Sequence, residues 1–233
     1  MEKEVNTMLR IGDEAPAFKA ITTEGEISFP EDFEGKWVLF FSHPSDFTSV
    51  CTSELLTFGH LACEFEALNC QLVGLSVDSI PSHMAWLHTM EKMNYKGISN
   101  TEFHFPLIAD LSMNIAQAYG MIHPGESTTQ AVRTVYFIDP HNIIRAIIYY
   151  PMALGRNFDE LKRVLIGLQT IDKFEVALPA DWHPGDDVIV PAPKSMEEME
   201  KKKKDPDEAI TCYDWFLCTK PLPQEKIVKA LKK

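Results

Sequence analysis

Residues Trp37–Glu54, with the sequence WVLFFSHPSDFTSVCTSE, decide the fold of this chain. The first part, Trp37–Phe41, is apolar, aromatic and β-branched, which predicts a buried strand. Pro44 ends that strand, and Thr48 or its neighbour can cap a helix that follows. Cys51 therefore falls in the first turn of a helix that comes directly after a core strand.

This position predicts a reactive thiol at Cys51. A helix N-terminus carries partial positive charge and unpaired N–H groups, so a thiol there loses its proton more easily, and the thiolate is the reactive form. The Thr48 hydroxyl, three residues earlier, can reach the sulfur or a bound substrate oxygen. The alternative is that Cys51 is a small buried packing residue, which is the usual role of a lone cysteine after a strand.

Composition excludes several classes of protein. The 233 residues carry 22 Lys+Arg against 34 Asp+Glu, a net charge of −12, which argues against a nucleic-acid partner. No stretch approaches the roughly 20 apolar residues of a membrane span, and Met1–Glu4 lacks a secretory pattern, so we expect a cytoplasmic protein. Five cysteines without a Cys-x-x-Cys or Cys-x-x-His pair favour reactive or buried thiols, and we expect no metal.

Strand and helix patterns alternate along the chain, which predicts a layered α/β sandwich. A turn at residues 139–142 joins two strands into a hairpin, so the sheet is mixed. The expected strands are 36–42, 71–77, 105–109, 133–138 and 143–150, and the expected helices are 49–68, 82–92, 112–119 and 158–168. We place one domain at 7–170 and an extension at 171–233.

The extension is rich in proline and charge, and we expect it to be too small to bury its aromatic side chains alone. Trp182, Trp215 and Phe216 need a surface to cover them. We expect that surface to be a second copy of the chain, reached by an arm across a two-fold axis.

The spacing of Pro44, Thr48 and Cys51 resembles the reactive-cysteine motif of the peroxiredoxins, and the longer run His43–Thr52 is similar to their one-cysteine (1-Cys) branch. Ser49 stands where that family usually has proline. Further matching segments agree in order along nearly the whole chain: Ser76–Ser79, Ser82–Trp86, Phe105–Asp110, Gly120–Pro124, Arg133, Phe137–Asp139, Tyr149–Pro151, Gly155–Arg156 and Leu178–Asp187.

The resemblance implies a thioredoxin-like fold with a mixed central sheet flanked by helices, plus a C-terminal extension. It implies that the chain reduces hydrogen peroxide and alkyl hydroperoxides with a cysteine, using no haem, flavin or metal. It also implies a homodimer, often assembled into a ring such as a decamer.

The resemblance assigns roles around the cysteine. Cys51 would attack the peroxide and become a sulfenic acid, while Arg133 would favour the thiolate and hold the peroxide oxygens. Arg156 is a second candidate for substrate binding in the same pocket. Thr48 would hydrogen-bond a peroxide oxygen or the sulfur.

Pro44 and His43 of the same motif, with Glu54 just after it, complete the expected pocket. Pro44 would limit the access of water to the thiolate. His43 would line the pocket entrance or, alternatively, contact backbone groups of the turn. Glu54 is expected at the start of the helix or in the pocket wall.

Cys212 and Cys218 depart from a strict one-cysteine scheme, and some members of the branch carry such a pair. Cys218 would resolve the sulfenic acid of Cys51 on the partner subunit, and exchange with Cys212 would give a Cys212–Cys218 disulfide open to thioredoxin or a similar dithiol. If the pair only packs, an external thiol must reduce Cys51 directly. Cys63 and Cys70 are expected to be buried or inert.

Two other functions remain open to test. A ring of subunits could act as a chaperone-like holdase, although the chain has no long exposed apolar segment to support that. A lipid hydrolase would need a Gly-x-Ser-x-Gly-like turn near residues 25–35, and Gly25–Glu31 does not match that pattern.

Overall fold

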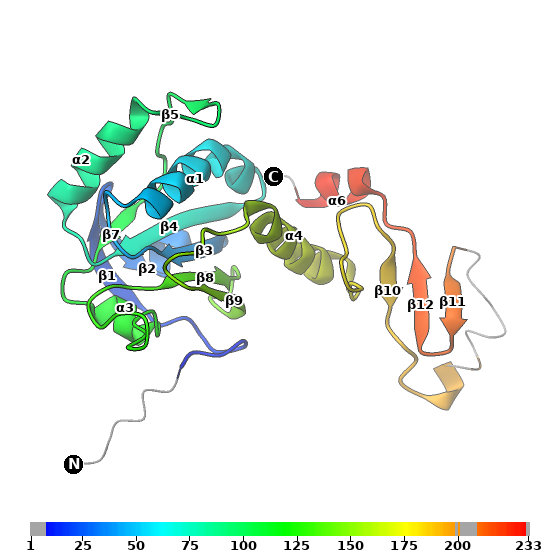
Figure 1. Cartoon of the computed structure of the whole chain (residues 1–233). Coiled ribbons are helices and arrows are strands. Elements are labelled where there is room, and N and C mark those ends of the chain that lie inside the picture. The colour runs from blue at the N-terminus through cyan, green and yellow to red at the C-terminus, as the bar shows by residue number, and fades with distance from the viewer. Residues whose placement is uncertain (1–7, 199, 201–208, 232–233) are drawn as a thin grey trace, which may run out of the picture. The chain divides into compact units, whose positions relative to one another are not determined.

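The computed structural model describes residues 8–198, 200 and 209–231 (Figure 1). The chain divides into two compact units, with the boundary between Phe158 and Asp159. Among the described residues, no helix combines the length and the apolar character needed to cross a membrane.

The first unit is built on one seven-stranded sheet in the order β2-β1-β7-β4-β3-β8-β9. β3, β4 and β7 run parallel to one another, and the other neighbours pair antiparallel, so the sheet is mixed, as the sequence predicts. The strands are β1 Phe18–Thr22, β2 Gly25–Phe29, β3 Trp37–Ser42, β4 Cys70–Ser76, β7 Leu107–Ala109, β8 Arg133–Ile138 and β9 Ile144–Tyr150.

Helices cover the sheet on both sides. α1 and α2 lie on one side and the short α3 lies on the other (Figure 1). The helices are α1 Ser49–Ala67, α2 Ile80–Glu91 and α3 Asn114–Ala118, and smaller elements are a 3-10 turn at Glu31–Phe33 and the strand pair β5 Asn94–Tyr95 and β6 Ile98–Ser99.

The central strand β3 is buried along its whole length, which explains its unbroken apolar sequence. Phe41 of β3 stacks on Phe58 of α1 with ring centroids 4.0 Å apart. Every residue of β8, the antiparallel neighbour of β3, is also buried. The loop between β3 and α1 is therefore fixed at both ends by core packing.

The second unit has a core of its own, which the sequence analysis did not foresee. Trp182 is fully buried against Val176, Val188, Leu222 and Ile227 of the same unit, so the expectation that a second copy must cover it is wrong. The elements of this part of the chain are α4 Phe158–Phe174, β10 Val188–Val190, β11 Thr211–Asp214, β12 Leu217–Lys220 and α6 Gln224–Leu231. Side chains of α4, β10 and α6 contribute to the core.

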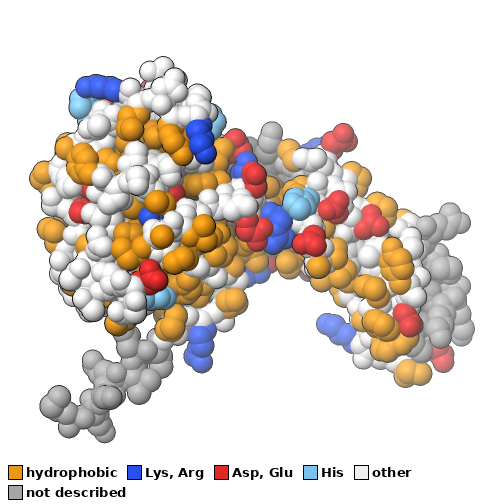
Figure 2. Space-filling view, viewed as in Figure 1, with side chains coloured by type: hydrophobic (Ala, Val, Ile, Leu, Met, Phe, Trp, Pro, Cys, Tyr) orange, Lys and Arg blue, Asp and Glu red, His pale blue; other side chains and the backbone are white. Residues whose placement is uncertain are grey.

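Trp215 and Phe216 differ from Trp182. They lie at the turn of the β11–β12 hairpin and remain 58% and 56% exposed. Hydrophobic side chains are visible on the surface of the second unit where this hairpin lies (Figure 2). Their covering by a second copy stays a prediction.

Candidate active site

Cys51 lies where the sequence places it, in the first turn of α1 just after β3. α1 begins at Ser49 with Thr48 as its N-cap residue, so Cys51 is the third residue of the helix. Its side chain is free and fully buried. The N-terminal end of α1 therefore directs its partial positive charge at a thiol that is shielded from bulk water.

Sheet topology brings Arg133 to this thiol across 82 residues of sequence. β8 runs antiparallel to β3, so the first residues of β8 lie beside the last residues of β3. Arg133 is the first residue of β8, and its Nη1 donates to Cys51 Sγ at 3.3 Å. Its Nε and Nη2 both donate to the carbonyl oxygen of Met152, at 2.9 and 2.7 Å, which fixes the plane of the guanidinium group.

Glu54 links two arginines in this site. It follows Cys51 by three residues on α1, and so projects from the same side of the helix. Its Oε2 accepts from Arg133 Nη1 at 2.7 Å and from Arg156 Nη1 at 2.6 Å. Its Oε1 accepts from the backbone N–H of Arg156 at 2.8 Å. All three side chains are at least 97% buried.

Arg156 holds the two central strands in place at this edge. Its Nη2 donates to the carbonyl oxygens of Ser42, at the end of β3, and of Thr134 in β8. Burial lowers the pKa of Arg156, while the Glu54 carboxylate opposes that shift. Arg156 therefore links the ends of β3 and β8 to Glu54, and its part in binding substrate stays a prediction.

The charges of this group favour an anion at Cys51. Arg133 and Arg156 contribute two positive charges, and Glu54 compensates only one of them. An uncompensated charge in a dry site is costly, so the site is most stable when a further anion completes it. The Cys51 sulfur, already bonded to Arg133, is the group in position to supply that anion.

The other residues predicted for the pocket lie on the loop from His43 to Thr48, here called the Cys51 loop. Pro44 is buried there. Thr48 is exposed, and its hydroxyl donates to the carbonyl oxygen of Ser45 at 2.9 Å instead of contacting the sulfur. His43 is fully buried, with its side chain turned toward Asp46, so it does not line an entrance.

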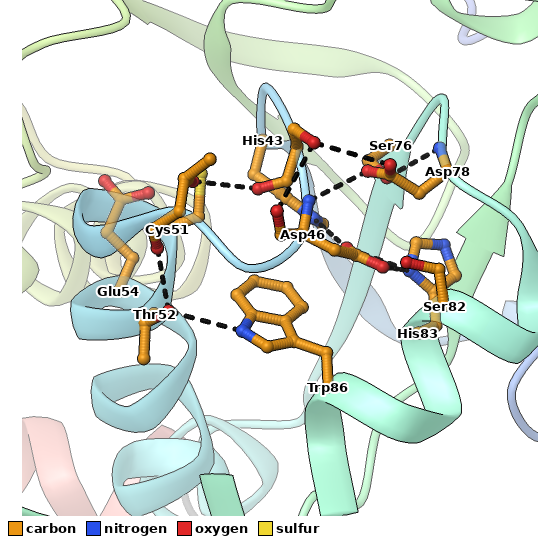
Figure 3. A network of polar contacts seen from close by, with 12 residues as sticks. His43, Asp46, Cys51, Thr52, Glu54, Ser76, Asp78, Ser82, His83 and Trp86 are labelled. Atoms are coloured by element: carbon orange, nitrogen blue, oxygen red, sulfur yellow. Dashed lines mark hydrogen bonds and ion pairs between the residues drawn. The ribbon is translucent and has the colours of Figure 1, made fainter. Parts of the chain in front are cut away.

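Asp46 is the centre of a second buried network, between the Cys51 loop and α2 (Figure 3). Its Oδ1 is 3.0 Å from His43 Nε2, and its Oδ2 is 2.8 Å from His83 Nδ1. Burial alone would raise the pKa of the Asp46 carboxyl, but the hydrogen bonds with His43 and His83 outweigh it and hold the pKa well below its usual range. Burial lowers the pKa of His43.

Two further contacts attach the same region. The backbone N–H of Asp46 donates to the Asp78 carboxylate at 2.9 Å, just beyond the end of β4. Trp86 of α2 donates from Nε1 to the Thr52 hydroxyl in the first turn of α1, at 3.2 Å (Figure 3). α2 therefore holds both the loop and the helix that carry the thiol.

Three atoms of this network are also possible metal ligands. His43, Asp46 and His83 place one such atom each within 4.8 Å of one another. Imidazole nitrogens and a carboxylate suit zinc, but His43 Nε2 and His83 Nδ1 are already hydrogen-bonded to the Asp46 carboxylate. The absence of a metal from the chemistry stays a prediction.

Cys212 and Cys218 are joined in a disulfide. They face each other as directly paired residues of the β11–β12 hairpin. The site residues of the first unit and this disulfide belong to different units of the chain.

The remaining cysteines differ in exposure. Cys70 is buried, as expected, and burial raises the pKa of its thiol. Cys63 is exposed, so of the two expected alternatives burial does not apply to it, and its inertness stays a prediction. Neither residue contacts the arginines around Cys51 through a hydrogen bond identified in the structure.

Glu54, Asp46 and His83 are site residues that the local sequence hardly indicates. Glu54 lies three residues after Cys51, Asp46 lies inside the motif, and His83 lies in a helix far along the sequence. A buried polar residue becomes recognisable only when its partners are known, and these partners come from separate elements.

Comparison with known proteins agrees with this geometry. Residues 11–147 match the AhpC/TSA family, and residues 167–205 match the C-terminal domain of 1-Cys peroxiredoxin. A peroxiredoxin of Methanosarcina mazei is 52% identical over 211 residues, which cover 90% of this chain and 96% of that protein. Peroxiredoxin 2 of Caldanaerobacter subterraneus is 48% identical, covering 91% and 92% of the two chains.

Solved structures give the same result. The yeast mitochondrial 1-Cys peroxiredoxin, studied for thiol resolution via glutathione/thioredoxin systems, matches with a TM-score of 0.80 and 37% identity, over 92% of this chain and 100% of that chain. The C45S mutant of peroxiredoxin 6 of Arenicola marina matches with a TM-score of 0.81 and 33% identity, over 93% and 99%. The predicted thioredoxin-like fold is confirmed. The chain belongs to the peroxiredoxin family, in its 1-Cys branch, and is a thiol-dependent peroxidase.

Proposed function

We propose that Cys51 is the residue that reacts with peroxide. Its thiolate sulfur attacks one peroxide oxygen, the O–O bond breaks, and the other oxygen leaves as hydroxide or alkoxide and takes up a proton. The products are the Cys51 sulfenic acid and one molecule of water or alcohol. The observation that carries this proposal is the 3.3 Å contact between Arg133 Nη1 and Cys51 Sγ, in a site with one positive charge in excess.

Arg133 acts on the reacting atoms in this proposal. Fixed donors stabilise charge as it develops on a leaving oxygen, and the two bonds to Met152 hold the guanidinium group in place before reaction. The Thr48 hydroxyl can turn from Ser45 to a peroxide oxygen, while Pro44 limits access of water to the sulfur. His43 and Arg156 support these groups from buried positions.

Substrates and surroundings follow from the same proposal. The substrates are hydrogen peroxide and alkyl hydroperoxides, and the chemistry uses no metal, haem or flavin. Residues 7–170 form the peroxidase domain, and residues 171–233 form a dimerisation arm in a cytoplasmic homodimer that assembles into a ring such as a decamer. The exposed Trp215 and Phe216 support contact with a second copy.

Resolution by the tail is the second step we propose. The Cys218 thiol of a partner copy attacks the Cys51 sulfenic acid, so that an S–S bond forms and water leaves. Cys212 then displaces Cys51 from Cys218, and the resulting disulfide is reduced by thioredoxin or another dithiol. The disulfide that joins Cys212 to Cys218 at an accessible hairpin supports this order.

The same disulfide favours one alternative. While Cys212 and Cys218 are bonded to each other, neither offers a thiol to Cys51. In that state an external thiol must reduce the Cys51 sulfenic acid directly, as in a strict one-cysteine peroxidase.

One experiment tests the chemistry and separates these routes. The fully reduced protein receives one equivalent of hydrogen peroxide, excess thiol is blocked, and disulfides are mapped by mass spectrometry. An intersubunit Cys51–Cys218 bond followed by Cys212–Cys218 supports resolution by the tail. A Cys51 sulfenic acid without a disulfide supports the alternative, and an unmodified Cys51 rejects the proposed function.

A further inference from the structure

The burial of Cys51 sets a requirement on the catalytic cycle. The side chain is 0% exposed, and the Cys51 loop and α1 enclose it. A peroxide is small enough to enter such a site, but a cysteine of another chain or a peptide thiol is not. The oxidised sulfur must therefore leave its place beside Arg133 before any thiol can attack it.

Asp46 joins the Cys51 loop to α2, and this contact opposes such a movement. Asp46 belongs to the loop, five residues before Cys51, whereas His83 lies one turn into α2. The two side chains meet through a pair of contacts, 2.8 Å and 3.1 Å from His83 Nδ1 to the two carboxylate oxygens. Figure 3 shows the two side chains facing each other. Both are at least 99% buried.

Both ring nitrogens of His83 face acceptors. Its Nε2 lies 3.2 Å from the carbonyl oxygen of Ile108, and its Nδ1 faces the Asp46 carboxylate. The His83 ring is therefore held from both ends, by β7 on one side and by the Cys51 loop on the other.

The other groups around this contact come from outside α2. His43 donates its Nε2 hydrogen to Asp46 Oδ1 from within the same loop. Asp78 accepts from the backbone N–H of Asp46, and Ser76 donates its hydroxyl to Asp78. Removing one partner of a buried hydrogen bond leaves the other polar group unsatisfied, which is far more costly than loss of a surface contact.

We propose that His83 is a positioning residue that latches the Cys51 loop through Asp46 and thereby sets how often oxidised Cys51 becomes accessible to a thiol. The proposal rests on the proposed function of Cys51. In the latched state the sulfur stays beside Arg133, and in the released state it can meet a second thiol.

The latch would control which of two reactions consumes the Cys51 sulfenic acid. With a thiol, an S–S bond forms and water leaves. With a second peroxide, the sulfur gains an oxygen, the O–O bond breaks, and water or alcohol leaves, which gives a sulfinic acid. The second reaction needs the peroxide-binding groups around Arg133, so it takes place in the latched state.

The test measures this partition in the full-length chain with Cys212 and Cys218 both changed to serine, so that only an added thiol can resolve Cys51. Each variant receives fixed concentrations of hydrogen peroxide and glutathione. Mass spectrometry then gives the ratio of glutathione disulfide to sulfinic acid on Cys51. The variants are His83→Gln and Asp46→Asn, and His88→Gln is the control, because His88 lies exposed on the same helix.

We expect His83→Gln and Asp46→Asn each to raise this ratio about tenfold, because loss of a buried hydrogen bond to a carboxylate changes an opening equilibrium by that order. The rate at which Cys51 is first oxidised should stay within about twofold of the parent. His88→Gln should change neither quantity. A rise of less than about threefold in both latch variants, or a fall, overturns the proposal.

A further readout separates the latch from the peroxidase chemistry and from general destabilisation. Hydrogen exchange of a peptide covering residues 43–54 in the reduced protein should be faster in His83→Gln but unchanged in His88→Gln. Unchanged exchange in His83→Gln rejects the latch even where Cys51 reacts normally, whereas an unreactive Cys51 in the parent rejects the proposed function instead.

Discussion

Replacing Arg133 by alanine should move the pH dependence of the peroxide reaction upward. Arg133 Nη1 lies 3.3 Å from Cys51 Sγ, and no water separates the two buried groups in this geometry. At an effective dielectric constant of 20, a unit charge at that distance attracts a thiolate by about 5 kcal/mol. Removing the arginine removes this attraction. The positive charge of Arg156 then balances the negative charge of Glu54, and the site has no positive charge in excess.

The observed effect should be smaller than this Coulomb energy. Arg156 and the N-terminal end of α1 remain, and water can enter the space that the guanidinium leaves. Changes of about 1 to 3 pH units are typical when one adjacent charge is removed. We therefore expect the midpoint of the pH–rate profile for Cys51 oxidation to rise by about 1 to 3 units, since stabilisation of the thiolate is lost.

The assay is single-turnover oxidation of Cys51 by hydrogen peroxide, followed between pH 5 and about 9, a range that covers the usual titration of a thiol. Arg133→Lys is the matched control, because it keeps the charge but cannot donate to Cys51, Glu54 and Met152 together. Its profile should stay near that of the parent while its maximal rate falls. A profile of Arg133→Ala that coincides with the parent would refute the electrostatic role of Arg133.

Three further changes test other parts of the account. Cys51→Ser should abolish peroxide reduction without changing the melting temperature by more than a few degrees, and turnover near that of the parent would end the assignment. Cys218→Ser should prevent a covalent dimer on non-reducing gels after peroxide treatment, whereas Cys212→Ser should allow it to accumulate; a dimer that persists in Cys218→Ser points to Cys212 as the resolving thiol. Asp46→Asn should be less stable than the parent at neutral pH, and the difference in unfolding free energy should shrink as the pH falls below about 4, because the depressed pKa of Asp46 stabilises the fold only while its carboxyl is ionised. A difference that stays constant down to acid-induced unfolding would contradict the buried pairs of Asp46.

The first half of the site follows from local sequence. A strand, a proline and a helix start at residues 37–54 place Cys51 by short-range rules alone, and the structure confirms α1 and β3 within one residue of their expected bounds. Arg133 could be predicted as a site residue only from the family resemblance. Its distance from Cys51 in sequence is closed by antiparallel pairing of β3 with β8, which no local pattern encodes.

The polar networks could not be predicted, because they depend on three-dimensional proximity. Glu54 binds residues 79 and 102 positions away, and Asp46 binds a histidine 37 positions away. Without those partners, each side chain resembles an ordinary polar residue near a helix start. Their burial is what makes them functional candidates.

The second unit was underestimated for a different reason. Its strands have three or four residues each, and proline and charged residues flank them, so the two-residue alternation of a strand hardly develops. Trp182 therefore looked like a residue in search of a partner chain. Side chains of α4, β10 and α6 supply the apolar cover that the local sequence pattern does not indicate.

The most direct test of the central claim is to determine which cysteine is oxidised first. The reduced chain is treated with less than one equivalent of hydrogen peroxide in the presence of a nucleophile that traps only sulfenic acids, and the labelled peptide is identified. Exposure alone would direct the label to Cys63, because Cys51 is buried. If Arg133 and the charge of the site activate the sulfur, the label is found on Cys51 and decreases at neutral pH in Arg133→Ala. Label on Cys63, with Cys51 unmodified, would contradict the account.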